Sequence, residues 1–191
     1  NVILLIPLRQ ICIRNPQPLR FHKGHSPALR IGAARARRFA SSAVLDNVSQ
    51  LWASAERKAR DTALILSETI RVPVQTDPDL GENDRSATGF LPPDQFEAAA
   101  DQFFAAPKQS FRGWETAQAA QSRIIGAVTR IVEGRSSGDI AIVSHGAVGT
   151  LLFCHLSQTP IDRAYDQPHQ GHYWSADLPN LVPRHGWRSI G

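Results

Sequence analysis

The stretch from Asp139 to Leu152 constrains the fold of this chain most strongly. Residues 140–143 are consecutive apolar residues bounded by Asp139 and Ser144, which is typical of a strand buried on both faces of a sheet. The sequence Ser144-His145-Gly146 predicts a sharp turn, and the apolar run after it predicts a helix that folds back over the sheet. His145 is therefore expected where open α/β sheets bind ligands and where a helix N-terminus favours anions. The turn alone leaves a second interpretation equally open, in which the polar residue only caps the helix.

Apolar runs of strand length alternate with amphipathic segments of helix length along most of the chain. This order predicts an α/β fold, a three-layer αβα arrangement with a mostly parallel central sheet, in a single domain spanning residues 1–191. Ser54 is expected to cap the helix that follows it. The expected strands are Val2–Ile6, Ser49–Ala53, a brief edge strand at Val72–Val74, the central strand and an edge strand at His172–Leu178. The expected helices run from Arg30, over Glu56–Ile70, from Pro93 to Pro107, from Thr116 to Val132 and over Ala147–Phe153. A long loop is expected between Pro7 and Pro27.

Charge is distributed unevenly along the sequence. The net charge is +4, yet residues 1–45 contain eight Lys or Arg and no Asp or Glu. Such a basic segment suits an anionic partner, but it lacks interleaved aromatic residues and any recognisable binding module, which argues against a nucleic-acid partner. The two cysteines, Cys12 and Cys154, form no spaced pair, so a reducing, cytoplasmic location is expected. No apolar run approaches transmembrane length, so no membrane partner is expected either.

Polar residues that follow the predicted strands provide a candidate site. Lys58 and His145 lie just after two strand ends, and Glu82 lies in a polar, turn-rich loop. A carboxylate beside a lysine and an imidazole at a helix start predicts a phosphate pocket, with Ser54 and Arg57 nearby. The alternatives are that Arg57 and Lys58 form a solvated helix face and that Glu82 is an ordinary loop acid.

The order of these residues resembles the histidine phosphatase superfamily, also called phosphoglycerate mutase-like. The family has a helix signature S-P-L-x-R-A-x-x-T-A, then an L-x-E loop and a V-S-H-G turn. The resemblance covers the chain from about Ala28 to Leu156. A bacterial subgroup whose helix reads E-R-K-A is similar over Glu56–Ala59, 81–90 and 110–116. The matching motifs are Ser54-x-x-x-Lys58-Ala59-x-x-Thr62-Ala63, Leu80-x-Glu82 and Ser144-His145-Gly146.

The resemblance implies a two-step phosphoryl transfer on a phosphorylated small molecule or a phosphoprotein. A histidine after the first strand attacks phosphorus, and water then hydrolyses the phosphohistidine. His145 and Lys58 are implied to hold the phosphate oxygens, and Glu82 to protonate the leaving oxygen. Neither a metal nor an organic cofactor is implied. Lys58 stands where most members have arginine, so a point charge replaces a bidentate clamp.

The chain departs from the family at the nucleophile. The family's R-H-G, or H-P-E in the subgroup, should fall at residues 7–10, where Leu8 occupies the place of the histidine. Leucine has no nucleophilic atom, so turnover is expected to be impaired. Three explanations are open: a pseudoenzyme that keeps a phosphate- or partner-binding pocket, an error in the recorded sequence, or a different register of the motif. His22 and His25 could reach the pocket but are interpreted as solvated loop residues, and Arg184-His185-Gly186 as tail structure.

Overall fold

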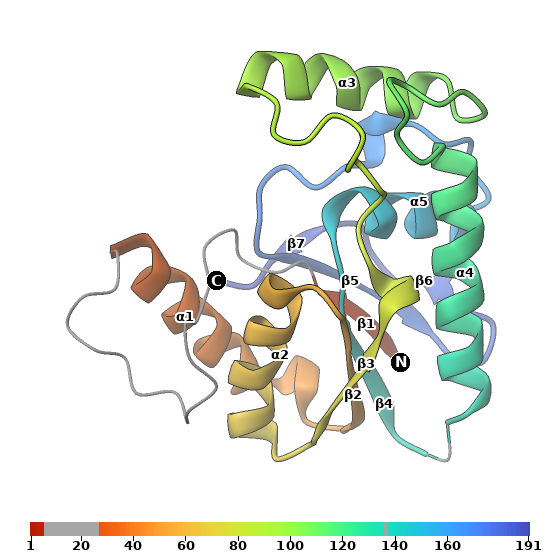
Figure 1. Cartoon of the computed structure of the whole chain (residues 1–191). Helices are drawn as coiled ribbons and strands as arrows, with labels where there is room; N and C mark the ends of the chain where they lie inside the picture. Colours follow the sequence, from red (N-terminus) through yellow and green to blue (C-terminus); the bar gives the residue numbers. More distant parts are fainter. Residues whose placement is uncertain (6–26, 136) are drawn as a thin grey trace.

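A mostly parallel sheet forms the centre of the molecule (Figure 1). The computed structural model describes residues 1–5, 27–135 and 137–191, and all statements below concern these residues. Within them the sheet has seven strands: the order is β3 (Val74–Asp77), β2 (Val48–Ser54), β4 (Asp139–Val143), β1 (Val2–Leu5), β5 (His172–Asp177) and β6 (Val182–Pro183), and β7 (Arg188–Ser189) pairs with β5. β1 to β4 run parallel to one another, whereas β5 is antiparallel to β1.

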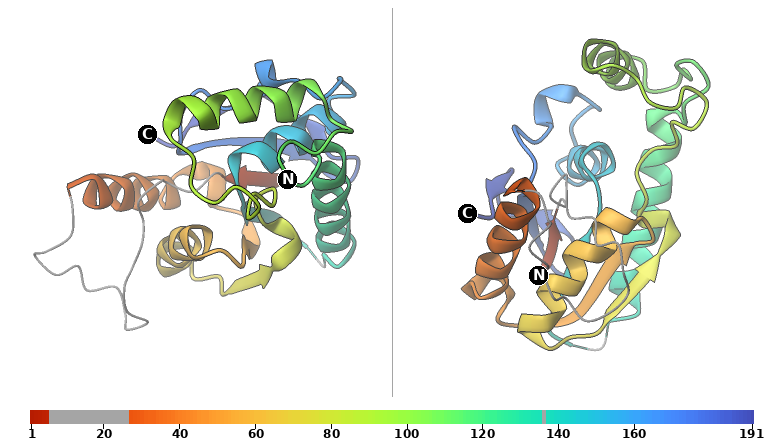
Figure 2. Two further views of the ribbon diagram at one scale, coloured as in Figure 1. Left: turned by 45° about the horizontal axis from the view of Figure 1, so that its top comes forward. Right: turned by 60° about the vertical axis from the view of Figure 1, so that its left-hand side comes forward.

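Helices cover both faces of this sheet, giving the predicted three-layer αβα fold (Figure 2). The packing of β4 shows why both faces need cover: Ile140 and Ile142 belong to one hydrophobic cluster, and Ala141 and Val143 to the other. One face carries α1 (Pro27–Ala40) and α2 (Arg57–Ile70), and the other carries α4 (Ala117–Glu133) and α5 (Gly146–Leu156). α3 (Pro93–Ala105) lies beyond one end of the sheet. The described residues also form three short 3₁₀ turns: η1 (Ala43–Leu45), η2 (Pro78–Leu80) and η3 (Arg163–Tyr165). None of the described helices is long and apolar enough to cross a membrane.

The helices form where periodicity and capping agree. The predicted apolar stripes of α1, α2 and α4 are buried, as shown by Ala36, Ala63 and Ile124, each with no exposed surface. Thr116 caps α4, its hydroxyl accepting the backbone N–H of Ala119 at 3.1 Å. The prolines before and after α3 mark its ends as predicted.

Three local predictions were wrong or displaced. β5 is an interior strand, because the C-terminal tail supplies β6 and β7 on the side away from β1, and five of its six residues are buried. The edge strand predicted at Val72–Val74 begins only at Val74. Ser54 is the last residue of β2 and Glu56 is the N-cap of α2; the Ser54 hydroxyl instead accepts the Glu56 backbone N–H at 3.2 Å.

The register of the parallel strands brings several chain segments to one edge of the sheet. Leu5 and Ala53 both pair with Val143, so β1, β2 and β4 end at the same level. The residues that follow β2 and β4 therefore meet there, and α3 lies on the same side of the molecule (Figure 1). This edge is where the sequence predicts the functional site.

We expect Gly138→Ala to lower the free energy of unfolding by about 1–3 kcal/mol. Gly138 has φ +69°, and a Cβ there would lie 2.5 Å from the Ser49 hydroxyl oxygen and 3.0 Å from the Asn47 carbonyl oxygen. Urea denaturation measures the change. Gly186→Ala is the matched control, because a Cβ at Gly186 meets nothing within 4 Å; its effect should stay within about 0.5 kcal/mol. Equal effects of the two changes would contradict the prediction.

Candidate functional site

His145 is a buried imidazole between β4 and α5. It is the N-cap residue of α5 and only 1% exposed, and within the described chain neither of its ring nitrogens has a hydrogen-bond partner. Burial lowers the pKa of His145 to about 2, and the positive charges of Lys58, Arg85 and Arg123 act in the same direction. The ring is therefore neutral at physiological pH. Its side chain does not cap α5, so the helix-cap interpretation receives no support from these contacts.

Glu82 lies beside this imidazole on the loop after η2. Its carboxylate oxygen Oε1 accepts the backbone N–H of Val148, in the first turn of α5, at 3.3 Å. Burial of the carboxyl group raises the pKa of Glu82, although Lys58, Arg85 and the backbone hydrogen bonds from Val148 and Asn83 oppose the rise. A carboxyl group with a raised pKa keeps its proton at higher pH, which suits a proton donor.

Glu56, a residue that the sequence analysis did not select, joins the predicted site residues. Its Oε1 accepts the backbone N–H of Glu82 at 2.9 Å and lies 3.2 Å from Nε2 of His145. Its other oxygen, Oε2, lies 3.8 Å from Nζ of Lys58. Lys58, Glu82 and His145 thus converge on one carboxylate. In the sequence, Glu56 is the first residue of the E-R-K-A motif, which indicated a subgroup of the family but did not indicate a role for this residue.

The remaining predicted residues differ in their placement. Ser54 is buried and lines a cavity of about 420 Å³ next to Glu56 and Glu82. Arg57 does not line that cavity in the described chain; its Nε lies 3.6 Å from Asp61 Oδ2, one turn along α2. Leu8, the predicted nucleophile position, lies outside the described residues, as do His22 and His25. His185 contacts the Ser175 hydroxyl at 3.0 Å, in agreement with a role in the tail.

The cavity beside the site offers further polar groups. Asn83 is 5% exposed, and its Nδ2 donor has no partner among the described residues. Arg85 also lines the cavity, and its guanidinium lies over the rings of Phe96 and Trp114, at 5.1 and 5.7 Å from their centroids. No group of three or more His, Cys, Asp or Glu residues in the described chain could hold a metal ion. The cavity is lined by Ser54, Ala55, Glu56, Pro78, Gly81, Glu82, Asn83, Asp84, Arg85 and Ser86.

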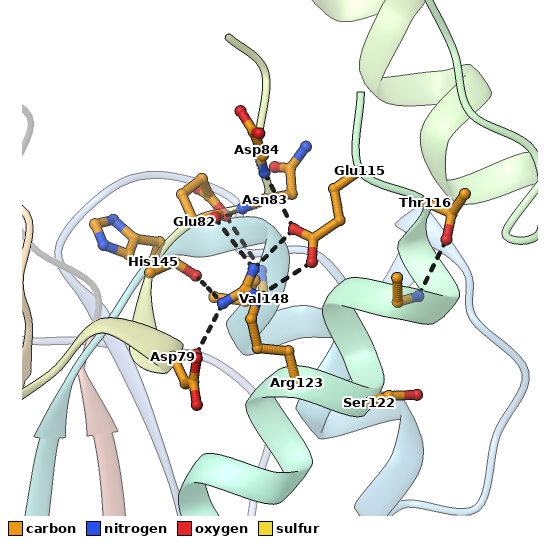
Figure 3. Close-up of polar contacts among 12 residues, drawn as sticks. Asp79, Glu82, Asn83, Asp84, Glu115, Thr116, Ser122, Arg123, His145 and Val148 are labelled. Atoms are coloured by element: carbon orange, nitrogen blue, oxygen red, sulfur yellow. Dashed lines mark hydrogen bonds and ion pairs between the residues drawn. The ribbon is translucent and has the colours of Figure 1, made fainter. Parts of the chain in front are cut away.

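Arg123 of α4 holds the loop that carries Glu82 (Figure 3). Its guanidinium donates to the carbonyl oxygens of Asp79, Gly81 and Glu82 at 2.8, 2.9 and 3.2 Å. It also forms a bidentate pair with Glu115, at 3.1 and 2.8 Å, which raises the pKa of Arg123. The sequence shows Arg123 only as a cation between the buried positions of a helix, so its role could not be read from motifs.

The structure is an α/β domain in which Glu56, Lys58, Glu82 and His145 gather at the carboxyl ends of its parallel strands. Residues 23–176 match the family model described as the histidine phosphatase superfamily (branch 1). The chain belongs to this superfamily, which confirms the resemblance of its motifs. No curated protein matches the chain.

Solved structures share the fold over nearly the whole chain. A mycobacterial glucosyl-3-phosphoglycerate phosphatase in complex with inorganic phosphate has 16% identity and a TM-score of 0.74, covering 99% of this chain and 97% of its own. YhfR from Bacillus stearothermophilus has 22% identity and a TM-score of 0.70, covering 97% and 95%. The alpha-ribazole phosphatase from Shigella flexneri has 18% identity and a TM-score of 0.67, covering 100% and 96%. These similarities confirm the fold.

We expect Arg123→Met to lower the free energy of unfolding by about 2–4 kcal/mol, because it leaves three carbonyl oxygens without this donor and Glu115 without its cation, with only the Asp84 backbone N–H still donating to Glu115. Chemical denaturation measures the loss. Arg130→Met is the control on the same helix: the Arg130 side chain is 55% exposed, and its pairs with Asp77 and Asp79 should contribute less than about 1 kcal/mol. Similar losses for both variants would contradict the special role of Arg123.

We expect the free energy of unfolding to decrease as the pH is lowered, and we expect His145 to cause part of this decrease. The folded protein, in which the pKa of His145 is about 2, binds this proton far more weakly than the unfolded chain, in which it is about 6.5. The cost is absent above pH 6.5 and grows as the pH falls below it, reaching about 2 kcal/mol at pH 5. Glu56 does not reverse this sign, because its side chain is 45% exposed and its charge is screened.

The measurement is the free energy of unfolding at pH 7.5, 6 and 5. His145→Asn should lose about 2 kcal/mol less than the unmodified chain between the first and last pH. His155→Asn, at an exposed position of the same helix α5, is the control and should follow the unmodified chain. Parallel pH curves for all three proteins would show that His145 is not the group responsible.

Proposed function

We propose that this chain binds the phosphoryl group of a phosphorylated small molecule or phosphoprotein at His145, Lys58 and Glu82, and that its phosphomonoesterase activity is impaired because Leu8 replaces the nucleophile. One observation carries the binding proposal: Lys58 Nζ, His145 Nε2 and the Glu82 backbone N–H all face the carboxylate of Glu56. An anion already occupies this position, so a phosphoryl oxygen there would meet the same groups. A cytoplasmic location stays a prediction from cysteine usage.

The two-step phosphoryl transfer that the family implies gives each residue of the proposed site a role. A histidine nitrogen forms a bond to phosphorus while the ester P–O bond breaks, and Glu82 gives its proton to the leaving oxygen. Water then breaks the P–N bond, and the Glu82 carboxylate takes a proton from that water. Lys58 and His145 stabilise the charge on the phosphoryl oxygens in both steps. Leu8 has no lone pair, so the first step cannot take place at that position.

Leu8 also favours a second function, a catalytically inactive module that recognises a phosphate or a partner protein. The binding groups do not depend on the nucleophile, since Lys58, Glu82 and His145 come from other elements. The names of two structural neighbours, glucosyl-3-phosphoglycerate phosphatase and alpha-ribazole phosphatase, support small phosphomonoesters as the substrate class. Binding without turnover separates the inactive module from the enzyme.

The deciding experiment measures vanadate binding and p-nitrophenyl phosphate turnover together. We expect the unmodified chain to bind vanadate with little turnover and no acid-labile phosphoenzyme. His145→Ala should weaken binding about tenfold or more, the effect of removing a hydrogen bond to a charged group. Leu8→His should gain turnover if only that nucleophile is missing.

His155→Ala serves as the control for the binding measurement, and circular dichroism verifies that each variant is folded. Unchanged binding in His145→Ala would remove His145 from the site. Robust turnover by the unmodified chain would refute the impairment and assign the nucleophile to another residue. A folded Leu8→His variant without turnover would favour the inactive binding module.

A further inference from the structure

The carboxylate of Glu56 lies where the proposed phosphoryl group would bind. Oε1 contacts the Glu82 backbone N–H at 2.9 Å and His145 Nε2 at 3.2 Å, and Oε2 lies 3.8 Å from Lys58 Nζ. A backbone donor, a ring nitrogen and a cation thus surround the two oxygens of one anionic group. A phosphoryl group presents its oxygens with a similar spacing and more charge. The carboxylate of Glu56 therefore makes the contacts that we expect the phosphoryl group of a ligand to make.

The surroundings of Glu56 indicate that this occupancy is reversible. The Glu56 side chain is 45% exposed, starts from the N-cap position of α2 and makes no capping hydrogen bond. A long side chain at such a position can rotate into solvent without disturbing the helix. His145, in contrast, is 1% exposed, and neither of its ring nitrogens has a hydrogen-bond partner in the described chain. The buried imidazole thus lacks a satisfied hydrogen bond, and the Glu56 carboxylate is partly exposed to water.

The cavity described above has Glu56 in its wall. Glu56 lines it together with Glu82 and Asn83, whereas neither His145 nor Lys58 is among the described residues of its wall. An anion in the cavity would therefore lie beside the Glu56 carboxylate. Two negative groups at this distance in a partly buried site repel each other strongly, so both cannot occupy the position.

We propose that Glu56 competes with the ligand for the anion site and must leave it before a phosphoryl group can bind. This inference rests on the proposed function, because it concerns the same site. The competition weakens binding of every anion by a similar factor. Free inorganic phosphate, with no organic part to contact the cavity wall, is then held poorly. A phosphomonoester whose organic part fills the cavity offsets the loss through those additional contacts.

Glu56→Gln tests the proposal because glutamine keeps a carbonyl oxygen that can accept the Glu82 N–H, removes the charge and replaces the other oxygen by an NH2 group of similar size. We expect the Kd for inorganic phosphate, measured by isothermal titration calorimetry, to fall about tenfold, which corresponds to about 1.4 kcal/mol. Glu68→Gln removes the same charge from an exposed position of α2 and should leave the Kd unchanged within about twofold. Thermal denaturation of both variants verifies that the fold is intact.

The outcomes separate the two proposals. Tighter phosphate binding by Glu56→Gln, with no change in Glu68→Gln, supports competition by Glu56, including the case in which only Glu56→Gln binds measurably. Equal or weaker binding by Glu56→Gln overturns the competition while the proposed function stands, provided that His145→Ala still loses binding. An equal gain in Glu68→Gln would overturn it too, because net charge would then explain the effect. Absence of binding in both the unmodified chain and Glu56→Gln overturns both proposals.

Discussion

The site depends on the parallel register of β1, β2 and β4. Because Leu5 and Ala53 both pair with Val143, three strands end at one level, and the segments that follow β2 and β4 begin side by side. The first turns of α2 and α5 then present Lys58 and the Val148 N–H toward the same volume. The hydroxyl of Ser144 donates to the Leu80 carbonyl at 2.8 Å and ties the η2 loop to the end of β4. A shift of one residue in this register would reverse the faces of a strand and separate these groups.

Electrostatics at this edge favour the neutral forms of His145 and Glu82. Burial disfavours charge on both His145 and Glu82, so it lowers the pKa of the first and raises the pKa of the second. The positive charge stays on Lys58, Arg85 and Arg123, of which Arg123 is held by Glu115. The imidazole of His145 therefore contributes a polar atom without a charge beside these cations.

The sequence predicted the elements whose pattern is local. The strand over residues 140–143, the turn at His145 and the stripes of the major helices follow from apolar periodicity, and the motifs around Lys58, Glu82 and His145 identified the family. The interior position of β5 could not be predicted, because it depends on tail strands that are only two residues long. Arg123 and Glu56 were missed for a related reason, because the contacts that make them important are not local. Glu56 contacts Glu82 and His145, which lie 26 and 89 positions away in the sequence. Arg123 contacts Asp79, 44 positions away, and no local pattern predicts such contacts.

The family match and the predicted nucleophile position fall on different parts of this chain. The family match covers residues 23–176, which contain Lys58, Glu82 and His145, but it begins after Leu8. Binding of a phosphoryl group needs only the cations and donors of the matched part, whereas transfer also needs a nucleophile with a lone pair. A fold can therefore retain the first ability after the second has been lost. For this reason anion affinity, and not turnover, reports most directly on the arrangement at the carboxyl edge of the sheet.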